Sequence, residues 1–118
     1  MLDPIDFSKP LIILEVGAGN GAITKEIINK LHPKGRLITV EILPKFAEEL
    51  KKEFDDPRVT VICDDVRNIQ THLSKLNIKN VDHIVSGLPL GSMTTNEIDS
   101  ILIKLYPVLK KKGIFVQF

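Results

Sequence analysis

Short apolar runs alternate with longer amphipathic stretches along the whole chain. Runs rich in Ile, Val and Leu occur at residues 11–16, 36–41, 58–63, 81–86 and 113–118. Their length and their many β-branched residues are typical of strands that are buried on both faces. Between them, apolar residues recur at helical spacing over residues 20–31, 44–54, 67–76 and 95–111. The pattern therefore predicts strands and helices in strict alternation.

The predicted helices carry ordinary start signals. Pro44 suits the first turn of the second helix, where its missing N–H would have no partner in any case. Thr94 or Thr95 can cap the last helix. Glu97 then lies in the first turn of that helix, where the helix dipole favours a carboxylate.

The stop signals are assigned in the same way. Gly113 lies where the chain is expected to leave the last helix. Pro107 should kink that helix or end its regular part early. The basic run at residues 110–112 is interpreted as a helix C-terminus, where cations offset the dipole. Contact with an anionic membrane surface is a second interpretation of this run.

This order of elements predicts an open α/β sheet. Consecutive strands joined by helices run parallel through right-handed crossovers, so we expect a Rossmann-like, mostly parallel, doubly wound sheet. Ligands of such sheets bind at the carboxyl ends of the strands. We therefore expect function to concentrate near residues 15–21, 41–42, 63–66 and 86–91.

Composition limits the classes of protein to which the chain can belong. Its 118 residues are 43% hydrophobic and 26% charged with a formal net charge of +1, which fits one soluble globular domain over residues 1–118. So small a charge argues against a protein held to nucleic acid mainly by bulk charge. Cys63 is the single cysteine, so we expect no internal disulfide, no cysteine-based zinc site and a reducing, cytoplasmic location.

The last predicted strand ends the chain without a helix to cover it. Residues 114–118 are Ile-Phe-Val-Gln-Phe. As an edge strand they would expose apolar side chains and unpaired backbone groups. We expect either a partner that protects this edge or, as the preferred interpretation, a fragment that lacks the last strands.

The most informative motif is the glycine-rich turn after the first predicted strand. Residues 15–21 are Glu-Val-Gly-Ala-Gly-Asn-Gly. Glycine permits positive φ and lets a ligand approach the backbone closely. The carboxylate of Glu15 would repel a pyrophosphate but suits a cationic ligand such as S-adenosylmethionine, which carries an ammonium and a sulfonium. Residues 17–22 also match the G-x-G-x-x-A fingerprint of NAD-binding domains.

Acidic residues also end the second and third predicted strands. Glu41 can accept both ribose hydroxyls of a nucleoside, an arrangement that neutral side chains copy poorly. Of Asp64 and Asp65, one can accept from the exocyclic amine of an adenine, while the other caps a helix or is solvated. We expect no metal site, because the histidines are interpreted as structural or solvated: His32, His72 and His83.

The loop after the fourth predicted strand is the candidate substrate-binding loop. It reads Ser-Gly-Leu-Pro-Leu-Gly at residues 86–91, with a rigid proline between two glycines. Such a loop has a fixed shape and lies beside the ligand-carrying edge of the sheet. We expect the hydroxyl of Ser86 and the carbonyls of Gly87, Leu88 and Pro89 to form the substrate-side wall.

Taken together, these motifs resemble class I S-adenosylmethionine-dependent methyltransferases. The match runs through residues 14–21, Glu41, residues 64–66 and the loop after the fourth strand. The resemblance implies the strand order 3-2-1-4-5, truncated here after strand 5. It also implies a set of cofactor-binding residues, which are Glu15, Gly17, Ala18, Gly19 and Gly21 at the methionine part, Glu41 at the ribose, Asp65 and Val66 at the adenine, and in addition Ile42 and Ser86.

The loop further resembles that of the bacterial phospholipid N-methyltransferases, which convert phosphatidylethanolamine to phosphatidylcholine. Residues 86–90 and the closing residues 115–118 carry this likeness. The related ribosomal RNA adenine dimethyltransferases have Asn-Leu-Pro-aromatic in the loop. Here Gly87 stands where that family's Asn would bind the target amine, and Leu90 where its ring would stack on the flipped base. We therefore predict methylation of a phospholipid headgroup amine rather than of RNA.

The resemblance also sets expectations for partners and location. A membrane phospholipid surface is the expected partner and RNA the weaker one, which places the protein in the cytoplasm or at the inner membrane face. The substrate-binding segment that would carry membrane contacts is reduced here to residues 1–10. Two other classes stay open, an NAD-dependent oxidoreductase and a non-catalytic S-adenosylmethionine-binding module or half of a split enzyme.

Overall fold

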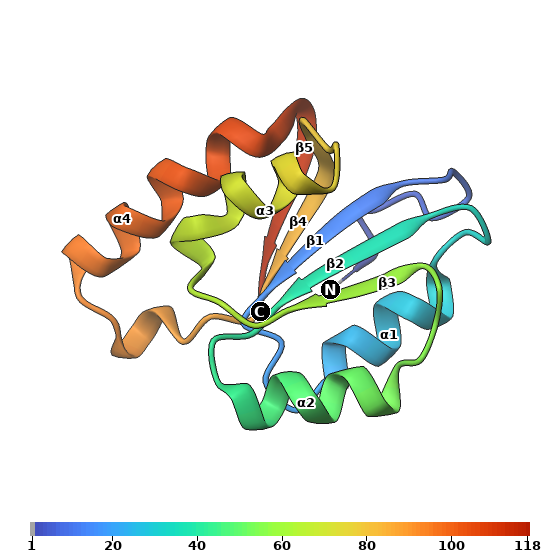
Figure 1. Cartoon of the computed structure of the whole chain (residues 1–118). Coiled ribbons are helices and arrows are strands. Elements are labelled where there is room, and N and C mark those ends of the chain that lie inside the picture. Colours follow the sequence, from blue (N-terminus) through green and yellow to red (C-terminus); the bar gives the residue numbers. More distant parts are fainter. Residues whose placement is uncertain (1) are drawn as a thin grey trace.

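The computed structural model describes residues 2–118 and contains one parallel sheet with helices on both faces (Figure 1). Its strands stand in the order β3-β2-β1-β4-β5, and every neighbouring pair is parallel, which confirms the predicted fold class. The strands are β1 (Ile12–Val16), β2 (Arg36–Val40), β3 (Val59–Ile62), β4 (Val81–Ser86) and β5 (Leu109–Gln117). The helices are α1 (Ala22–Lys30), α2 (Pro44–Glu53), α3 (Ile69–Lys75) and α4 (Thr95–Leu105), with short 3-10 turns η1 (Val66–Asn68), η2 (Leu90–Ser92) and η3 (Tyr106–Val108).

Two hydrophobic cores lie on the two faces of the sheet, because successive side chains of a strand point to opposite faces. Ile13 of β1 packs with Ile27 of α1 on one face. Its neighbour Leu14 packs on the other face with Leu73 of α3 and Leu105 of α4. Figure 1 shows the same division, with α1 and α2 on one side of the sheet and α3 and α4 on the other.

The segment before β1 contributes to the core on the α1 face. Leu2 is 2% exposed and Ile5 is 5% exposed, and both belong to the cluster that contains Ile13. These two side chains are therefore core residues rather than exposed membrane contacts. In the part of the chain that the structure describes, no helix is long and apolar enough to cross a bilayer.

The predicted start signals of α2 and α4 act as expected, and so does Pro107. Pro44 is the first residue of α2. Thr94 caps α4 in a capping box, in which its Oγ1 accepts from the N–H of Glu97 at 3.1 Å and its own N–H donates to Oε1 of Glu97 at 3.2 Å. Helix α4 ends at Leu105, and Pro107 lies in the 3-10 turn that follows. The prediction that Pro107 shortens this helix is confirmed.

The basic run at residues 110–112 is not a helix C-terminus, so that prediction is wrong. Strand β5 begins at Leu109 and contains the whole run. Helical structure ends with η3, directly before this strand, and Lys110 pairs with Asp82 of β4 at 2.8 Å. Because the strands are parallel, these lysines lie at the amino end of the sheet, opposite the end where ligands of such folds bind.

Gly113 also lies inside β5 rather than at a helix end, which corrects the second stop signal. The pairing of β4 with β5 shifts register between Val81, which faces Leu109, and His83, which faces Ile114. Gly113 lies at this irregularity, where a β-bulge is the usual structure. The sequence pattern therefore predicted only the second half of the strand.

Candidate functional site

A cavity of about 490 Å³ opens at the carboxyl ends of the strands, where the sequence predicts ligand binding. Its walls come from the turns after β1, β2, β3 and β4 and from residues 97–101 of α4. Most of the predicted site residues line it, namely Gly17, Gly19, Glu41, Ile42, Asp65, Val66, Gly87, Leu88 and Pro89. Four of them are not among the lining residues, namely Glu15, Ala18, Gly21 and Ser86.

The glycine turn between β1 and α1 forms one wall of the cavity. Its glycines have φ values of 71° at Gly17, 56° at Gly19 and 86° at Gly21, which residues with a Cβ rarely adopt. A Cβ on Gly19 would meet no atom within 4 Å, so this glycine faces open cavity space. A Cβ on Gly21 would meet the side chains of Leu50 and Phe54 at 2.9 Å. Gly21 therefore allows α2 to pack closely against the turn.

Glu15 lies beneath the turn and not on the cavity wall. It is 1% exposed, and its Oε1 accepts from the hydroxyls of Thr24 at 2.6 Å and Thr39 at 2.8 Å. Its Oε2 has no hydrogen-bond partner within residues 2–118. Burial raises the pKa of Glu15 above its ordinary value, and the hydrogen bonds from the two hydroxyls partly oppose this. Ala18, 6% exposed, is also buried within the turn.

Glu41 connects the end of β2 to the glycine turn. Its Oε1 accepts from the N–H of Gly19 at 2.8 Å, and its Oε2 accepts from the N–H of Leu43 at 2.9 Å. Glu41 is only 7% exposed but lines the cavity. Each carboxylate oxygen can accept a further hydrogen bond, so the predicted contact with a diol fits this geometry. Beside it, Ile42 is 58% exposed and adds an apolar surface to the wall.

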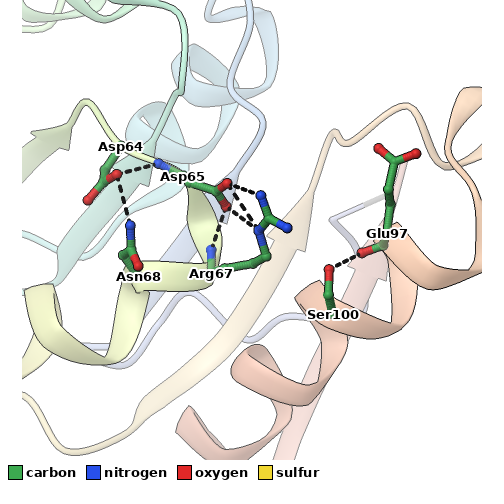
Figure 2. Close-up of polar contacts among 6 residues, drawn as sticks. All are labelled: Asp64, Asp65, Arg67, Asn68, Glu97 and Ser100. Atoms are coloured by element: carbon green, nitrogen blue, oxygen red, sulfur yellow. Dashed lines mark hydrogen bonds and ion pairs between the residues drawn. The ribbon is translucent and has the colours of Figure 1, made fainter.

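The two aspartates after β3 have different partners, most of which Figure 2 shows. Asp65 caps η1 by accepting from the N–H of Arg67 at 2.9 Å, and it also pairs with the Arg67 guanidinium. Asp64 accepts from Nδ2 of Asn68 at 3.1 Å and lies 2.7 Å from Nε2 of His72. Arg67 lowers the pKa of Asp65, and His72 lowers that of Asp64. Both aspartates line the cavity, so Asp65 combines the capping and ligand-facing positions that the sequence assigned to separate residues.

The other two histidines accept hydrogen bonds from the backbone. Nδ1 of His32 accepts from the N–H of Lys34 at 3.0 Å. Nδ1 of His83 accepts from the N–H of Ile114 at 3.0 Å. Within residues 2–118, no three His, Cys, Asp or Glu side chains are grouped so that they could hold a metal ion.

The loop after β4 packs directly onto the glycine turn. The N–H of Gly87 donates to the carbonyl of Val16 at 2.8 Å. A Cβ on Gly87 would lie 2.7 Å from the carbonyl oxygen of Gly17, so a side chain fits here only if the backbone moves. Conversely, a Cβ on Gly17 would meet the backbone nitrogen and Cδ2 of Leu88 at 3.0 Å. The two turns approach so closely that both positions need glycine.

Ser86 is fully buried at the base of this loop. Its Oγ accepts from the N–H of Leu88 at 3.3 Å, and the residue pairs in register with Gln117 of β5. Its hydroxyl, which the sequence assigned to orienting an acceptor, thus has a partner within the loop. Leu88 and Pro89 line the cavity above it.

Sequence reasoning missed the wall that α4 and its approach contribute. Met93, Glu97, Ser100 and Ile101 line the cavity, as does Arg67 of η1. In Figure 2, Glu97 and Ser100 lie on the side opposite Asp65 and Arg67. The Thr94 capping box marked the helix start, but no local pattern indicates that its first turns face the cavity. That orientation depends on how α4 packs against η1.

The cavity is acidic. Glu41, Asp64, Asp65 and Glu97 line it, and Arg67 is the single basic residue among the lining side chains of residues 2–118. Such a balance favours a cationic ligand over an anionic one. Open backbone at Gly19 and hydrogen-bond acceptors for hydroxyl and amine groups fit S-adenosylmethionine, which carries a sulfonium, a ribose and an adenine.

Comparison with known sequences gives the following relatives. The family model described as a methyltransferase domain matches residues 13–113. An ornithine lipid N-methyltransferase of Singulisphaera acidiphila is 33% identical over 114 residues, which are 96% of this chain and 59% of that protein. Ribosomal RNA small subunit methyltransferase A of Mycoplasma capricolum is 29% identical over an alignment of 119 positions, which covers 95% of this chain and 43% of that protein. The chain thus spans about half the length of these two relatives.

Solved structures show the same fold at low sequence identity. Aeropyrum pernix fibrillarin with natively bound S-adenosyl-L-methionine has a TM-score of 0.75 at 18% identity, covering 92% of this chain and 45% of that one. The plantazolicin methyltransferase BamL has a TM-score of 0.70 at 22% identity, covering 86% of this chain and 35% of that one. The arrangement of sheet and helices is therefore the one that these proteins share.

Proposed function

The chain belongs to the S-adenosylmethionine-dependent methyltransferases of the methyltransferase domain family, and on that premise we propose that it methylates the amine of a lipid headgroup. The family match removes the NAD-dependent oxidoreductase as an alternative. The relatives include an ornithine lipid N-methyltransferase and ribosomal RNA methyltransferases. The choice between lipid and RNA therefore depends on the site itself.

The conformation of the loop at Gly87 is the observation that carries the proposal. With the carbonyl of Gly17 only 2.7 Å from the Cβ position, this backbone has no room for an Asn side chain. Leu90, at the start of η2, offers no aromatic ring. A flipped adenine would thus lack both the amide and the stacking surface that hold it in RNA adenine methyltransferases. A flexible headgroup amine needs neither.

The charge of the cavity supports the same choice. Its walls carry the carboxylates of Glu41, Asp64, Asp65 and Glu97. A protonated headgroup amine is attracted to such a cavity, whereas the exocyclic amine of adenine is uncharged and gains no such attraction. Phosphatidylethanolamine and ornithine lipid both present an amine of this kind.

We assign the cofactor to the half of the cavity formed by the turns after β1, β2 and β3. The open backbone at Gly19, with Gly17 beside it on the cavity wall, would admit the methionine part, and Glu41 would accept the ribose hydroxyls. Asp65 and Val66 would meet the adenine. When bound, S-adenosylmethionine supplies a methyl group on a positively charged sulfur, already activated for transfer.

The remaining predicted residues would support the cofactor site from outside the wall. The buried carboxylate of Glu15 adds negative charge beneath the turn, while Ala18 and Gly21 allow the turn to pack against its neighbours. Ile42 would cover the nucleoside with its exposed apolar side chain. Ser86 would hold the acceptor loop through the N–H of Leu88.

The loop after β4 would place the acceptor amine. A headgroup ammonium has no lone pair, so it must lose a proton to water before the nitrogen can be methylated. The protein's contribution is then mainly orientation and exclusion of water, which suits a rigid loop that is held by the sheet. Gly87, Leu88 and Pro89 line the cavity where this amine would lie.

The test is a comparison of acceptors with methyl-labelled S-adenosylmethionine. The 118-residue chain is incubated with vesicles that contain phosphatidylethanolamine, with vesicles that contain ornithine lipid, and with an adenine-containing ribosomal RNA hairpin. We expect the label in the lipid phase. A Glu41→Ala variant, which lacks the proposed ribose contact and should bind the cofactor poorly, serves as the negative control. Label in the RNA and none in either lipid would contradict the proposal.

A further inference from the structure

We propose that Gln117 of β5 is a positioning residue for the acceptor loop, acting through the carbonyl of Leu88. The inference rests on the proposed function, because it concerns how that loop would present itself to an acceptor amine. Gln117 does not line the cavity and would touch neither cofactor nor acceptor. By occupying the carbonyl oxygen of Leu88, it would determine which backbone oxygen of the loop can bind an acceptor amine.

Two of the three loop carbonyls already accept two hydrogen bonds each. The oxygen of Leu88 accepts from the N–H of Leu90 at 2.9 Å and from Nε2 of Gln117 at 2.9 Å. The oxygen of Pro89 accepts from the N–H and the Oγ of Ser92, both at 3.0 Å. A carbonyl oxygen has two lone pairs, so neither has capacity left for an amine.

Gly87 differs from its two neighbours. Its carbonyl accepts no hydrogen bond from any group within residues 2–118, and the residue lines the cavity. The loop therefore offers an acceptor amine one unoccupied oxygen. This selectivity holds only while the neighbouring carbonyl of Leu88 stays engaged.

The bond from Leu90 to Leu88 would be a weak anchor by itself. Pro89 has φ −79° and ψ 69°, the geometry of an inverse γ-turn closed by a bond between residues two apart. Gln117 adds a second bond that comes from the sheet. It pairs in register with Ser86, so the pairing of β4 with β5 fixes where its amide lies. Its Nε2 also donates to the carbonyl of Phe118 at 2.9 Å.

The chain contains a matched control for this contact. Gln70 of α3 donates from Nε2 to the carbonyl of Lys104 in α4 at 3.2 Å. The chemistry is the same, a side-chain amide bound to a backbone carbonyl. Gln70 contacts neither the cavity nor the acceptor loop. Its substitution removes a hydrogen bond of the same kind, longer and more exposed than that of Gln117, and leaves the acceptor loop unchanged.

The experiment compares Gln117→Leu with Gln70→Leu by three measurements. These are the dissociation constant of S-adenosylhomocysteine by calorimetry, hydrogen exchange of the amides at residues 87–92, and KM and kcat for phosphatidylethanolamine in mixed vesicles. For Gln117→Leu we expect about tenfold faster exchange at Leu90 and about tenfold higher KM, with cofactor affinity within twofold of wild type. For Gln70→Leu we expect no change in any of the three.

Each other outcome has a defined meaning. Unchanged exchange and unchanged KM in Gln117→Leu would overturn the proposal. Parallel loss of cofactor affinity and of helical circular dichroism would also overturn it, in favour of a purely structural role. If Gln117→Leu does not fold, Gln117→Glu takes its place, because it keeps the shape of the side chain but loses both donors. A wild type that methylates no lipid refutes the proposed function, while hydrogen exchange still decides whether Gln117 holds the loop.

Discussion

The glycine turn after β1 and the loop after β4 touch at Gly17 and Gly87, yet they are held in different ways. The glycine turn owes its shape to its own backbone, which has positive φ at three glycines, and to Glu41, which binds the N–H of Gly19. The β4 loop is held in addition by a side chain that is distant in the sequence, Gln117 of the neighbouring strand β5. Substitutions in the turn should therefore weaken binding of the cofactor, and substitutions that loosen the loop should raise the KM for the acceptor. Substitutions where the two regions touch should do both.

The largest effect is expected where the two regions meet. Gly17→Val places a Cβ 3.0 Å from the backbone of Leu88 and requires a branched residue at φ 71°. We expect the free energy of unfolding to fall by roughly 3 kcal/mol, measured by urea denaturation. Gly91→Val is the control, because a Cβ there meets no atom within 4 Å. Equal stability of the two variants would show that the turns do not pack as described.

A smaller and more selective effect is expected at Glu41. Glu41→Gln keeps the shape but removes the charge that binds the N–H groups of Gly19 and Leu43 and would bind the ribose. We expect the affinity for S-adenosylhomocysteine, measured by calorimetry, to fall about tenfold. The KM for the lipid acceptor should not change, since Glu41 belongs to the cofactor end. Glu48→Gln on the exposed surface of α2 should change neither quantity. A raised KM for the lipid in Glu41→Gln would contradict the division between a cofactor end and an acceptor loop.

The smallest effect is the pH dependence that Glu15 contributes. Burial raises its folded-state pKa above 4.5, so the folded chain binds this proton more tightly than the unfolded chain. The corresponding stability is fully present below pH 4.5 and is lost as the pH rises through the raised folded-state pKa. Glu15→Gln, which cannot ionise, should therefore be more stable than wild type by about 1 kcal/mol at neutral pH. The difference should vanish below the unfolded-state pKa.

Urea denaturation at neutral and acidic pH measures this difference, and Glu97 gives a control of opposite sign. Hydrogen bonds from Thr94 lower the pKa of Glu97, so its contribution is present above its unfolded-state pKa of 4.5 and is lost as the pH falls through the lowered folded-state pKa. Glu97→Gln should therefore lower stability at neutral pH. A Glu15→Gln variant that is less stable than wild type at neutral pH would show that the ionised carboxylate stabilises the turn.

The alternation of strands and helices and the position of the cofactor end could be predicted because their signals are local, whereas the strand order came from the resemblance to a known family. Strands β1 to β4 are short segments rich in Ile, Val and Leu, and the glycine turn after the first strand is confined to seven residues, Glu15–Gly21. Glu41 follows β2 directly, so its place at the sheet edge follows from the fold class alone. Whether these residues bind the cofactor as assigned stays a prediction.

The remaining features depend on contacts between distant parts of the chain. Three lysines in a row suggest a helix end, but the pairing of β5 with β4 begins at Leu109, so the lysines lie in β5. Glu97 and Ser100 reach the cavity only because α4 packs against η1. The filled carbonyl of Leu88 could not be foreseen either, since its second partner lies 29 residues away along the chain.

The most direct test of the account is the binding of S-adenosylhomocysteine to the 118-residue chain, measured by calorimetry beside Gly19→Val and Gly91→Val. Both substitutions add a side chain that meets no protein atom within 4 Å at its Cβ, but only Gly19 lines the cavity. Gly19 also has a positive φ of 56°, so Gly19→Val adds backbone strain that Gly91→Val does not, and circular dichroism controls for a loss of folding. The account predicts binding by wild type and by Gly91→Val, and at least a tenfold loss in Gly19→Val that retains its circular dichroism. A folded wild type that binds no S-adenosylhomocysteine, or a Gly19→Val variant that binds it equally well, would contradict the account.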